Sequence, residues 1–344
     1  MLAKPAAICY NGSMNNLVMQ VDKIISGIDF AAIWPGFKPC AFALYDDDIV
    51  CMRDDVIIPW DERFAGNTAI TLDGAPLAIW HVENPSSIDV NRLAMGLVHE
   101  MFHAFQYQQG EARFPDEFAL LTYPQDLNNY QLKLAENHYL AKAITDNSML
   151  DLQQFVILRE ARRRIIGNDA MMQEQAAETT EGMAEYAGLA ALIQISREQF
   201  MKEVQAHMEV LRNPRYLFDI RFMSYSVGCL ICFTLKSLGI DFNHELTDKR
   251  TIYEFIPHKR NDVERFFKEI QQNRQMRFDA FLEKHKKWVG CNAVITGFDP
   301  WGWEKLGDKI LCPGFVKLGD LHIDGPVMLE MKAGSVHQVV AYIK

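Results

Sequence analysis

The sequence lacks several features that would place it in other classes of protein. It has no stretch of 18 apolar residues, so no membrane-spanning helix is expected. Its start, "MLAKPAAICYNGSMNN", has no long apolar run behind basic residues and predicts no secretory signal. There is no basic stripe, and acidic residues outnumber basic ones by 45 to 35, so nucleic acid is not an expected partner. The seven cysteines are odd in number and scattered, which favours reduced thiols in a cytoplasmic protein over a disulfide framework.

Several polar or reactive side chains are interpreted as structural. Cys229 and Cys232 form a C-x-x-C within the apolar helical run "SVGCLICFTL", and no second pair is spaced to complete a zinc site with them. They are therefore predicted to be small buried residues. The run Arg162–Arg164 is expected to lie on a solvated helix face. His138 and His207 stand alone in helical patterns and are predicted to be surface or capped residues.

The remaining pattern predicts an α+β protein with three regions. Residues 1–110 mix helical and strand-like runs, and residues 111–290 carry apolar side chains at helical spacing almost throughout. Within the second region, separate helices are expected over 148–166 and 169–195. Glycine and proline become frequent in residues 291–344, where short β-like runs appear. The expected fold is a small N-terminal mixed sheet with one helix, a large mainly helical domain and a small β-rich C-terminal appendage.

The N-terminal region contains four strand-like runs followed by a helix. The runs occupy residues 39–53 and 68–82, are rich in β-branched and aromatic residues, and are bounded by Asp, Gly, Asn and Pro. Ser86, with Asp89 three residues later, is a variant of the capping box and predicts a helix start. Gly110 is the expected stop of this helix.

The stretch "LVHEMFHAFQ" (97–106) places two histidines and a glutamate among apolar residues. On a helix, His99 and His103 lie one turn apart on one face, so both imidazoles can bind one metal ion. Zinc suits two neutral imidazoles and a carboxylate, with a fourth position left for water. Glu100 follows His99 around the helix and can act on that water without ligating the metal. The alternative is a pair of core histidines bonded to backbone carbonyls.

A third ligand is expected on a later helix that carries a row of carboxylates. Glu174, Glu178, Glu181 and Glu185 recur at intervals of four, three and four residues, which places them on one helix face. No lysine or arginine lies within this stretch, and Ala, Met, Gly and Leu occupy its other flanks. One interpretation is that part of the stripe is solvated. If the stripe is buried instead, it requires a cation or histidine N–H donors.

These residues carry a family resemblance. "HEMFH", followed on a later helix by "EGMAEY" (181–186), resembles the zinc metallopeptidases called gluzincins, in which a glutamate of an E-G-x-A-x-[YF] segment completes the zinc shell. The resemblance implies a zincin-like fold and Zn²⁺ held by His99, His103 and Glu181. It also implies that Glu185, one turn further on, accepts the N–H of a ligating histidine. This chain departs from the family in the long gap of 77 residues between His103 and Glu181.

Two other segments are similar to parts of these peptidases. "SYSVGCLICFTL" (224–235) resembles a Tyr-x-x-Gly segment whose tyrosine donates a hydrogen bond to the tetrahedral oxyanion, which implies that role for Tyr225. Tyr123 and Tyr186 are alternatives for this role. Tyr225 could instead be a core or interface tyrosine whose hydroxyl is hydrogen-bonded within the protein. The strand "PLAIWHV" (76–82) corresponds in the family to a sheet edge that pairs with the substrate backbone. A plain core strand is the alternative.

The resemblance predicts a zinc-dependent hydrolase of peptide bonds that acts on a peptide or protein substrate. Glu100 would take the proton of water and pass it to the leaving amine. Three alternatives stay open: a zincin-fold regulatory or peptide-binding protein with restricted or lost peptidase activity, a hydrolase of a non-peptide amide, and a structural zinc site. A fourth protein ligand would favour the structural site. In the C-terminal region, Trp301 and Trp303 are either core anchors or a recognition surface.

Overall fold

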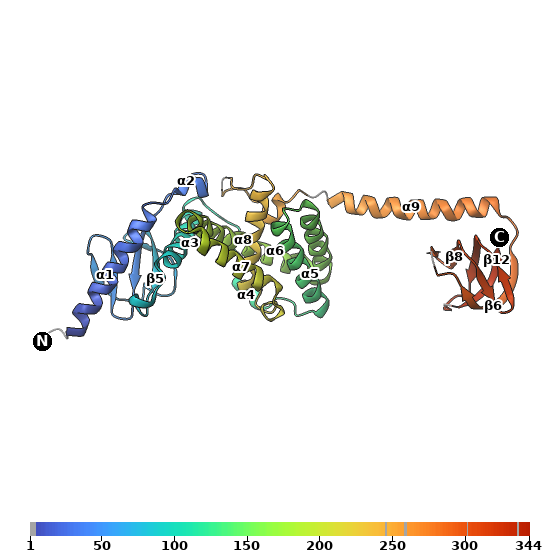
Figure 1. Ribbon diagram of the computed structural model, residues 1–344, viewed down its shortest axis with the longest axis horizontal. Coiled ribbons are helices and arrows are strands. Elements are labelled where there is room, and N and C mark those ends of the chain that lie inside the picture. The colour runs from blue at the N-terminus through green and yellow to red at the C-terminus, as the bar shows by residue number, and fades with distance from the viewer. Residues whose placement is uncertain (1–4, 245, 258–259, 301, 336) are drawn as a thin grey trace. The chain divides into compact units, whose positions relative to one another are not determined.

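The computed structural model of the chain has an α+β fold, as the sequence predicts, with a small mixed sheet, a large helical part and a separate β-rich C-terminal region. Its residues group into two compact units, 1–257 and 258–344 (Figure 1). The described residues are 5–244, 246–257, 260–300, 302–335 and 337–344. Among these residues, no helix combines the length and the apolar composition that a bilayer crossing requires.

The sheet of the first unit has five strands in the order β3-β2-β1-β5-β4. Their bounds are β1 Ala41–Tyr45, β2 Ile49–Met52, β3 Ile57–Pro59, β4 Thr68–Leu72 and β5 Ala75–His81. Strands β1 and β5 are parallel, and the other neighbours are antiparallel. The expectation that strand 76–82 is a sheet edge is wrong. Asp73 and Gly74, both with positive φ, form a two-residue turn that folds β4 onto the outer side of β5.

Helix α3 (Val90–Gln108) contains the two histidines and packs beside β5. Its N-cap is Asp89, whose carboxylate accepts hydrogen bonds from the first backbone N–H groups of the helix. Ser86 is not the cap, because it lies in a short 3₁₀ turn, η1 (Pro85–Ser87), that precedes the helix. The helix ends just before Gly110, whose φ of 75° is the left-handed conformation expected of a stop.

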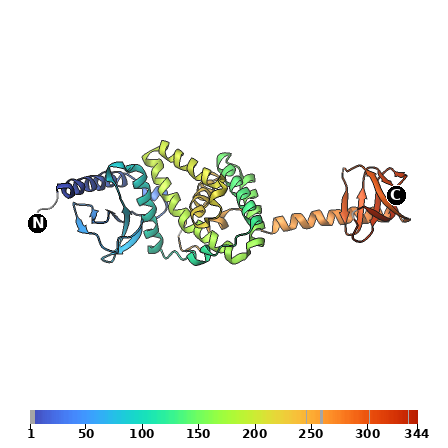
Figure 2. The same ribbon diagram turned by 90° about the horizontal axis from the view of Figure 1, so that it is seen from below.

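The rest of the first unit is helical, and the green-to-yellow helices gather into one bundle in Figure 1 and in Figure 2. The helices besides α3 are α1 Pro5–Ile25, α2 Phe30–Ile33, α4 Glu117–Leu121, α5 Leu127–Thr145, α6 Met149–Ile195, α7 Arg197–Arg212 and α8 Ile220–Ser237. Two 3₁₀ turns, η2 (Pro214–Tyr216) and η3 (Ile252–Phe255), follow α7 and α8 in the chain. The two helices expected over 148–166 and 169–195 are present as the two halves of α6, which meet at a kink where Gly167 (φ 86°, ψ 167°) leaves the helical conformation. Helix α6 contacts α3, α5, α7 and α8 and is the central helix of this unit.

Helices α6 and α8 cross with their backbones almost in contact. A Cβ atom added to Gly228 would lie 1.9 Å from the carbonyl oxygen of Glu178, and one added to Gly182 would lie 2.3 Å from the Cα of Gly228. Only glycine fits both positions. Beside this crossing, Cys229 and Cys232 are fully buried, which confirms the prediction that they are small core residues. The close crossing brings the side chains of α8 next to the carboxylates of α6.

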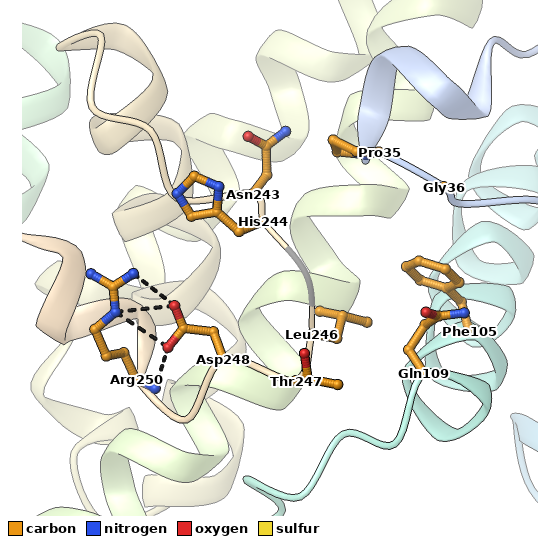
Figure 3. Close-up of a pocket in the computed structure, with 10 residues that line it drawn as sticks. All are labelled: Pro35, Gly36, Phe105, Gln109, Asn243, His244, Leu246, Thr247, Asp248 and Arg250. Carbon is orange, nitrogen blue, oxygen red and sulfur yellow. Dashed lines mark hydrogen bonds and ion pairs between the residues drawn. The ribbon is translucent and has the colours of Figure 1, made fainter.

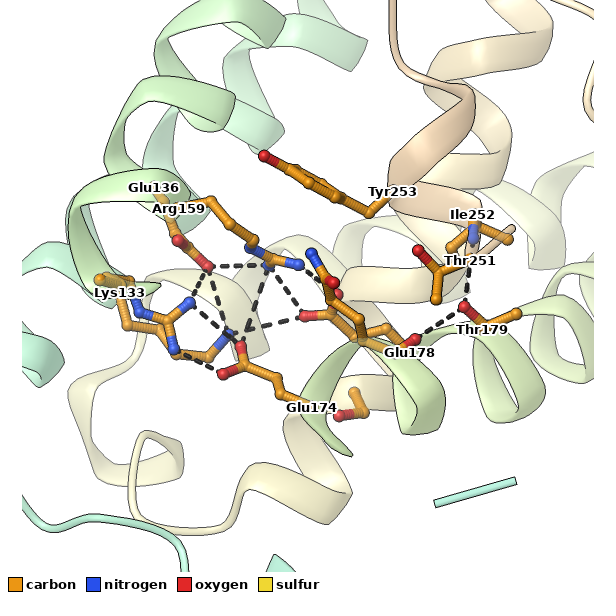
Figure 4. Close-up of polar contacts among 12 residues, drawn as sticks. Lys133, Glu136, Arg159, Glu174, Glu178, Thr179, Thr251, Ile252 and Tyr253 are labelled. Carbon is orange, nitrogen blue, oxygen red and sulfur yellow. Dashed lines mark hydrogen bonds and ion pairs between the residues drawn. The ribbon is translucent and has the colours of Figure 1, made fainter. Parts of the chain in front are cut away.

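A fully buried ionic network joins α5 to the two halves of α6 (Figure 4). The network consists of Lys133, Glu136, Arg159, Arg162, Glu174 and Glu178. Lys133 Nζ lies 2.5 Å from Glu174 Oε1, and Arg159 Nη2 lies 2.8 Å from Glu136 Oε1. Three cations face three carboxylates, so the charges balance within the buried volume. Glu174 and Glu178, half of the carboxylate stripe, are thus neutralised by side chains from outside the stripe.

The expectation of a solvated face at Arg162–Arg164 is wrong for its first residue. Arg162 is 0% exposed, and its Nη2 donates to Glu174 Oε2 at 2.6 Å. The bend of α6 at Gly167 separates Arg162 from the stripe along the chain. Arg163 is half-buried and Arg164 is exposed.

The second unit combines a long helix with a seven-stranded sheet. Helix α9 spans Arg260–Lys284, and the strands are β6 Val289–Phe298, β7 Glu304–Leu306, β8 Lys309–Cys312, β9 Val316–Leu318, β10 Leu321–Ile323, β11 Val327–Met331 and β12 Gln338–Ile343. The sheet order is β10-β9-β6-β12-β11-β8-β7, and Phe278 of α9 packs against Met328 and Ile343. Trp303 contacts Phe298, with ring centroids 4.5 Å apart. Trp301 lies outside the described residues.

Candidate metal centre

Three side-chain atoms of the kind that bind metal ions converge between α3 and α6. The Nε2 atoms of His99 and His103 are 3.1 Å apart, and Glu181 Oε2 lies 3.6 Å from the first and 3.3 Å from the second. Ligand atoms bound tetrahedrally to a zinc ion at 2.0–2.2 Å are separated by roughly 3.3–3.6 Å. The triangle formed by these atoms therefore has the dimensions of three corners of a zinc site.

The other nitrogen of each histidine is fixed by a hydrogen bond. His99 Nδ1 donates to Glu185 Oε2 at 2.8 Å, as the resemblance implies. His103 Nδ1 lies 2.7 Å from Gln106 Oε1, and the Gln106 amide is oriented because its Nε2 donates to the carbonyl oxygen of Thr180. Gln106 must then accept from His103. As neutral rings, both histidines carry their hydrogen on Nδ1 and direct the lone pair of Nε2 toward the other ring.

The carboxylate of Glu181 is buried and only half satisfied. Its Oε1 accepts a hydrogen bond from Arg221 Nη2 at 2.9 Å. Its Oε2 is buried and has no hydrogen-bond partner among the described residues. Unpaired buried oxygens of this kind are costly unless a cation is close. An orphaned carboxylate oxygen that faces two imidazole lone pairs is the donor set that a zinc ion fits.

Electrostatics at this point favours bound positive charge. Burial alone would lower the pKa of His99, but the carboxylates of Glu181 and Glu185 outweigh it and raise the pKa to about 10. Burial would raise the pKa of Glu181, but His103 and His99 hold it well below its ordinary value. The same holds for Glu185, whose pKa is depressed by His207 and His99. Both carboxylates therefore stay ionised, and the site attracts a proton or a metal ion.

Glu100 lies next to the ligands without taking part in their hydrogen bonds. One carboxylate oxygen of Glu100 and one ring nitrogen from each of His99 and His103 all lie within 4.8 Å of one another. Its side chain is buried, and this burial raises its pKa above the ordinary value, against the lowering effect of the two histidines. A carboxyl whose pKa is moved toward neutrality is suited to accept and return a proton.

Tyr225 of α8 is the tyrosine that the fold brings to the ligands. Its ring stacks on His99 with centroids 5.7 Å apart and planes at 11°. Burial, followed by the adjacent Glu181 carboxylate, raises the pKa of Tyr225, so the hydroxyl keeps its proton and remains a donor. The alternatives point elsewhere. Tyr123 donates to Glu174 at 2.6 Å within the ionic network, and the buried Tyr186 hydroxyl accepts from Lys236 at 3.0 Å.

Sequence reasoning missed His207 and Arg221. The expectation that His207 is a surface or capped residue is wrong, because its Nε2 donates to Glu185 Oε1 at 3.1 Å and its Nδ1 lies 2.9 Å from Ser226 Oγ. This histidine comes from α7, and no local pattern connects it to α6. The sequence contains only a weak indication of Arg221, which lies one helical turn before Tyr225 on the same helix.

A cavity of about 680 Å³ opens beyond the C-terminal half of α3 (Figure 3). Phe105 of α3 and Gln109, just after α3, line one side of it. The other lining residues are Pro35, Gly36, Asn243, His244, Leu246, Thr247, Asp248 and Arg250, and Arg250 pairs with Asp248. None of the metal-centre residues lines it. The cavity is therefore distinct from the converging ligand atoms.

Comparisons of the chain with protein-family models, curated proteins and solved structures find no match. The geometry of the site, above all the convergence of His99, His103 and Glu181, is therefore the basis for assigning a function.

Proposed function

We propose that this chain is a zinc-dependent hydrolase of peptide bonds, of the gluzincin type within a zincin-like fold. One observation carries the proposal: Glu181 Oε2 is buried, accepts no hydrogen bond from any residue that the structure describes, and faces two histidine Nε2 atoms at 3.6 and 3.3 Å. Three protein ligands are the number found in catalytic zinc sites, whereas structural sites have four. The proposal takes three ligands from the described residues and assigns the nearby Glu100 to the water, which supports an enzyme over a structural zinc centre.

Each residue has a distinct role in this proposal. His99, His103 and Glu181 would hold the zinc ion, and Glu185 fixes the tautomer of His99 through Nδ1. Bound zinc would polarise the substrate carbonyl and lower the pKa of water. The remaining steps belong to the side chains.

Glu100 takes the proton of the attacking water and delivers it to the leaving amine. For this role the carboxyl group of Glu100 must be able to change between its ionised and protonated states. The buried position and raised pKa of Glu100 support this role. The Tyr225 hydroxyl donates a hydrogen bond to the oxyanion, where one preorganised donor contributes about 3–4 kcal/mol. Its protonated state and its stacking on His99 support that role.

The test is the metal content of the purified protein, measured by mass spectrometry. We expect about one zinc per chain in the wild type and a sharp loss in both His103→Ala and Glu181→Ala. His138→Ala is the matched control, because His138 is an exposed histidine on α5. Hydrolysis of a peptide library by the zinc-loaded wild type then tests the activity. A wild type that takes up no metal when zinc is supplied would overturn the proposal.

A further inference from the structure

The guanidinium group of Arg221 bridges two carboxylates at the edge of the metal centre. Its Nη2 donates to Glu181 Oε1 at 2.9 Å, and its Nε lies 3.0 and 3.1 Å from the two oxygens of Glu117. Arg221 lies in the first turn of α8, and Glu117 begins α4. The same guanidinium lies 5.2 Å from the ring centroid of Tyr225. Arg221 therefore contacts a metal ligand, a neighbouring helix and the proposed oxyanion donor.

The Arg221 contact decides which oxygen of Glu181 is free. Oε1 accepts the hydrogen bond of the guanidinium, whereas Oε2 is buried, has no hydrogen-bond donor within the described part of the chain, and lies 3.6 and 3.3 Å from the two imidazole nitrogens. A carboxylate can ligate a metal through one oxygen or through both. With two histidines, a carboxylate that used both oxygens would fill four positions and leave none of a four-coordinate site open. A hydrolytic site requires that open position.

We propose that Arg221 is a positioning residue that restricts Glu181 to one ligating oxygen and so keeps a coordination position open. The inference rests on the proposed zinc hydrolase function and extends it to the control of coordination. It assigns Arg221 a geometric role and not a role in holding the metal. A cation beside a ligand repels a metal ion, so Arg221 does not strengthen metal binding.

Arginine suits this task better than lysine does. Its planar fork offers several N–H donors in fixed directions, which lets Nη2 hold Glu181 while Nε holds Glu117. A lysine supplies one point charge and cannot fix both carboxylates in these orientations. Glu117 tethers the outer side of the guanidinium, and the ring of Tyr225 covers part of it. The side chain is two-thirds buried between these partners.

The test uses the full chain with Co²⁺ in place of zinc and azide as a probe of the open position. In Arg221→Gln, we expect one cobalt per chain, a changed visible spectrum and azide affinity reduced by about tenfold or more. In the zinc-loaded protein, kcat should fall by about tenfold or more with little change in KM, because the loss affects the reacting position. Arg221→Lys should restore these properties only in part. Arg215→Gln, on an exposed arginine before α8, is the matched control and should behave as the wild type.

The outcomes separate the two proposals. If the wild type binds neither cobalt nor zinc, the proposed function fails. If the wild type binds cobalt and azide, and Arg221→Gln shows the same spectrum and azide affinity, only the role of Arg221 fails. If Arg221→Gln folds but loses its metal, Arg221 supports metal binding itself, which also overturns the inference. Arg221→Lys provides the same readouts if the glutamine variant does not fold.

Discussion

The Nε2 atoms of His99 and His103 lie 3.1 Å apart, while the Nδ1 atom of each ring is already bonded to another side chain. Two neutral imidazoles in this arrangement direct lone pairs at each other, which is favourable only with a proton or a metal ion between them. Glu181 Oε2 faces the same point and has no hydrogen-bond partner among the described residues. A proton and a metal ion would therefore compete for this point.

Metal affinity should rise with pH. The carboxylates of Glu181 and Glu185 outweigh burial and raise the pKa of His99 to about 10, so His99 is protonated below that pH. A metal ion must displace this proton, which makes binding about tenfold tighter for each unit of pH between 6 and 9. Zinc competition against a chelator of known pH dependence measures the slope. An affinity that does not change with pH would show that His99 gives up no proton.

Glu100→Gln should keep the metal and lose hydrolysis. The amide is close in size to the carboxylate but cannot accept a proton from water, so kcat should fall by about 10²–10⁴-fold. Zinc content by mass spectrometry and turnover of a cleaved peptide are measured on the same preparation. Full activity with bound zinc would remove Glu100 from the mechanism.

His207→Ala should weaken metal binding although His207 lies outside the ligand triangle. His207 holds Glu185 Oε1 at 3.1 Å, and Glu185 in turn holds His99 Nδ1. Loss of such an outer partner lowers metal affinity by about 10–100-fold. The comparison is His138→Ala, which should bind zinc as the wild type does. Equal affinity in the two variants would mean that His207 does not orient Glu185.

Gly228→Ala should destabilise the first unit by more than 3 kcal/mol, above the roughly 1–3 kcal/mol of ordinary overpacking. Its added Cβ would lie 1.9 Å from the Glu178 carbonyl oxygen, so α6 and α8 must separate. Urea unfolding of the full chain gives the free energy of unfolding. Gly12→Ala is the control, because Gly12 lies in α1 and, apart from its chain neighbours and the backbone of its own helix, no atom of the described residues lies within 4 Å of the added Cβ. Similar stability of the two variants would show that the helices can separate at little cost.

Arg162→Met should be strongly destabilising. It removes one of three buried cations and leaves Glu136 and Glu174 short of positive charge, which costs about 3–5 kcal/mol. The matched change is Lys202→Met, which breaks the exposed pair with Glu198 and should leave Tm nearly unchanged. Thermal unfolding followed by circular dichroism compares the two. A small effect of Arg162→Met would mean that water enters the network.

Local sequence patterns predicted the features that depend on a single helix or strand. The four-residue spacing of His99 and His103 and the stripe on α6 specify faces of single helices, and the structure confirms these helices. The strand-like runs of the N-terminal region are likewise confirmed as β1, β2, β4 and β5. Each of these features follows from the periodicity of a short segment.

Partners from distant segments were not predictable in this way. The stripe lacks basic residues along its own sequence, so nothing local indicated that Arg162, beyond the bend at Gly167, would turn inward to Glu174. His207 reaches Glu185 because α7 packs on α6. The position of β5 inside the sheet depends on the turn at Asp73 and Gly74. Each of these features depends on a tertiary contact, which the spacing of hydrophobic residues within one segment does not predict.

Helix α6 carries two kinds of carboxylate in one row. Glu174 and Glu178 are locked by Lys133, Arg159 and Arg162, and Glu181 and Glu185 follow within two turns of the same rigid helix. A shift of α6 by one residue would break the buried ion pairs. The ionic network therefore also fixes the position of Glu181 and Glu185 along the helix axis and around it. The residues proposed as ligands are therefore already assembled in the absence of an ion. On the proposed function, zinc would bind with little rearrangement of the protein, and we expect a chelated sample to regain zinc without refolding.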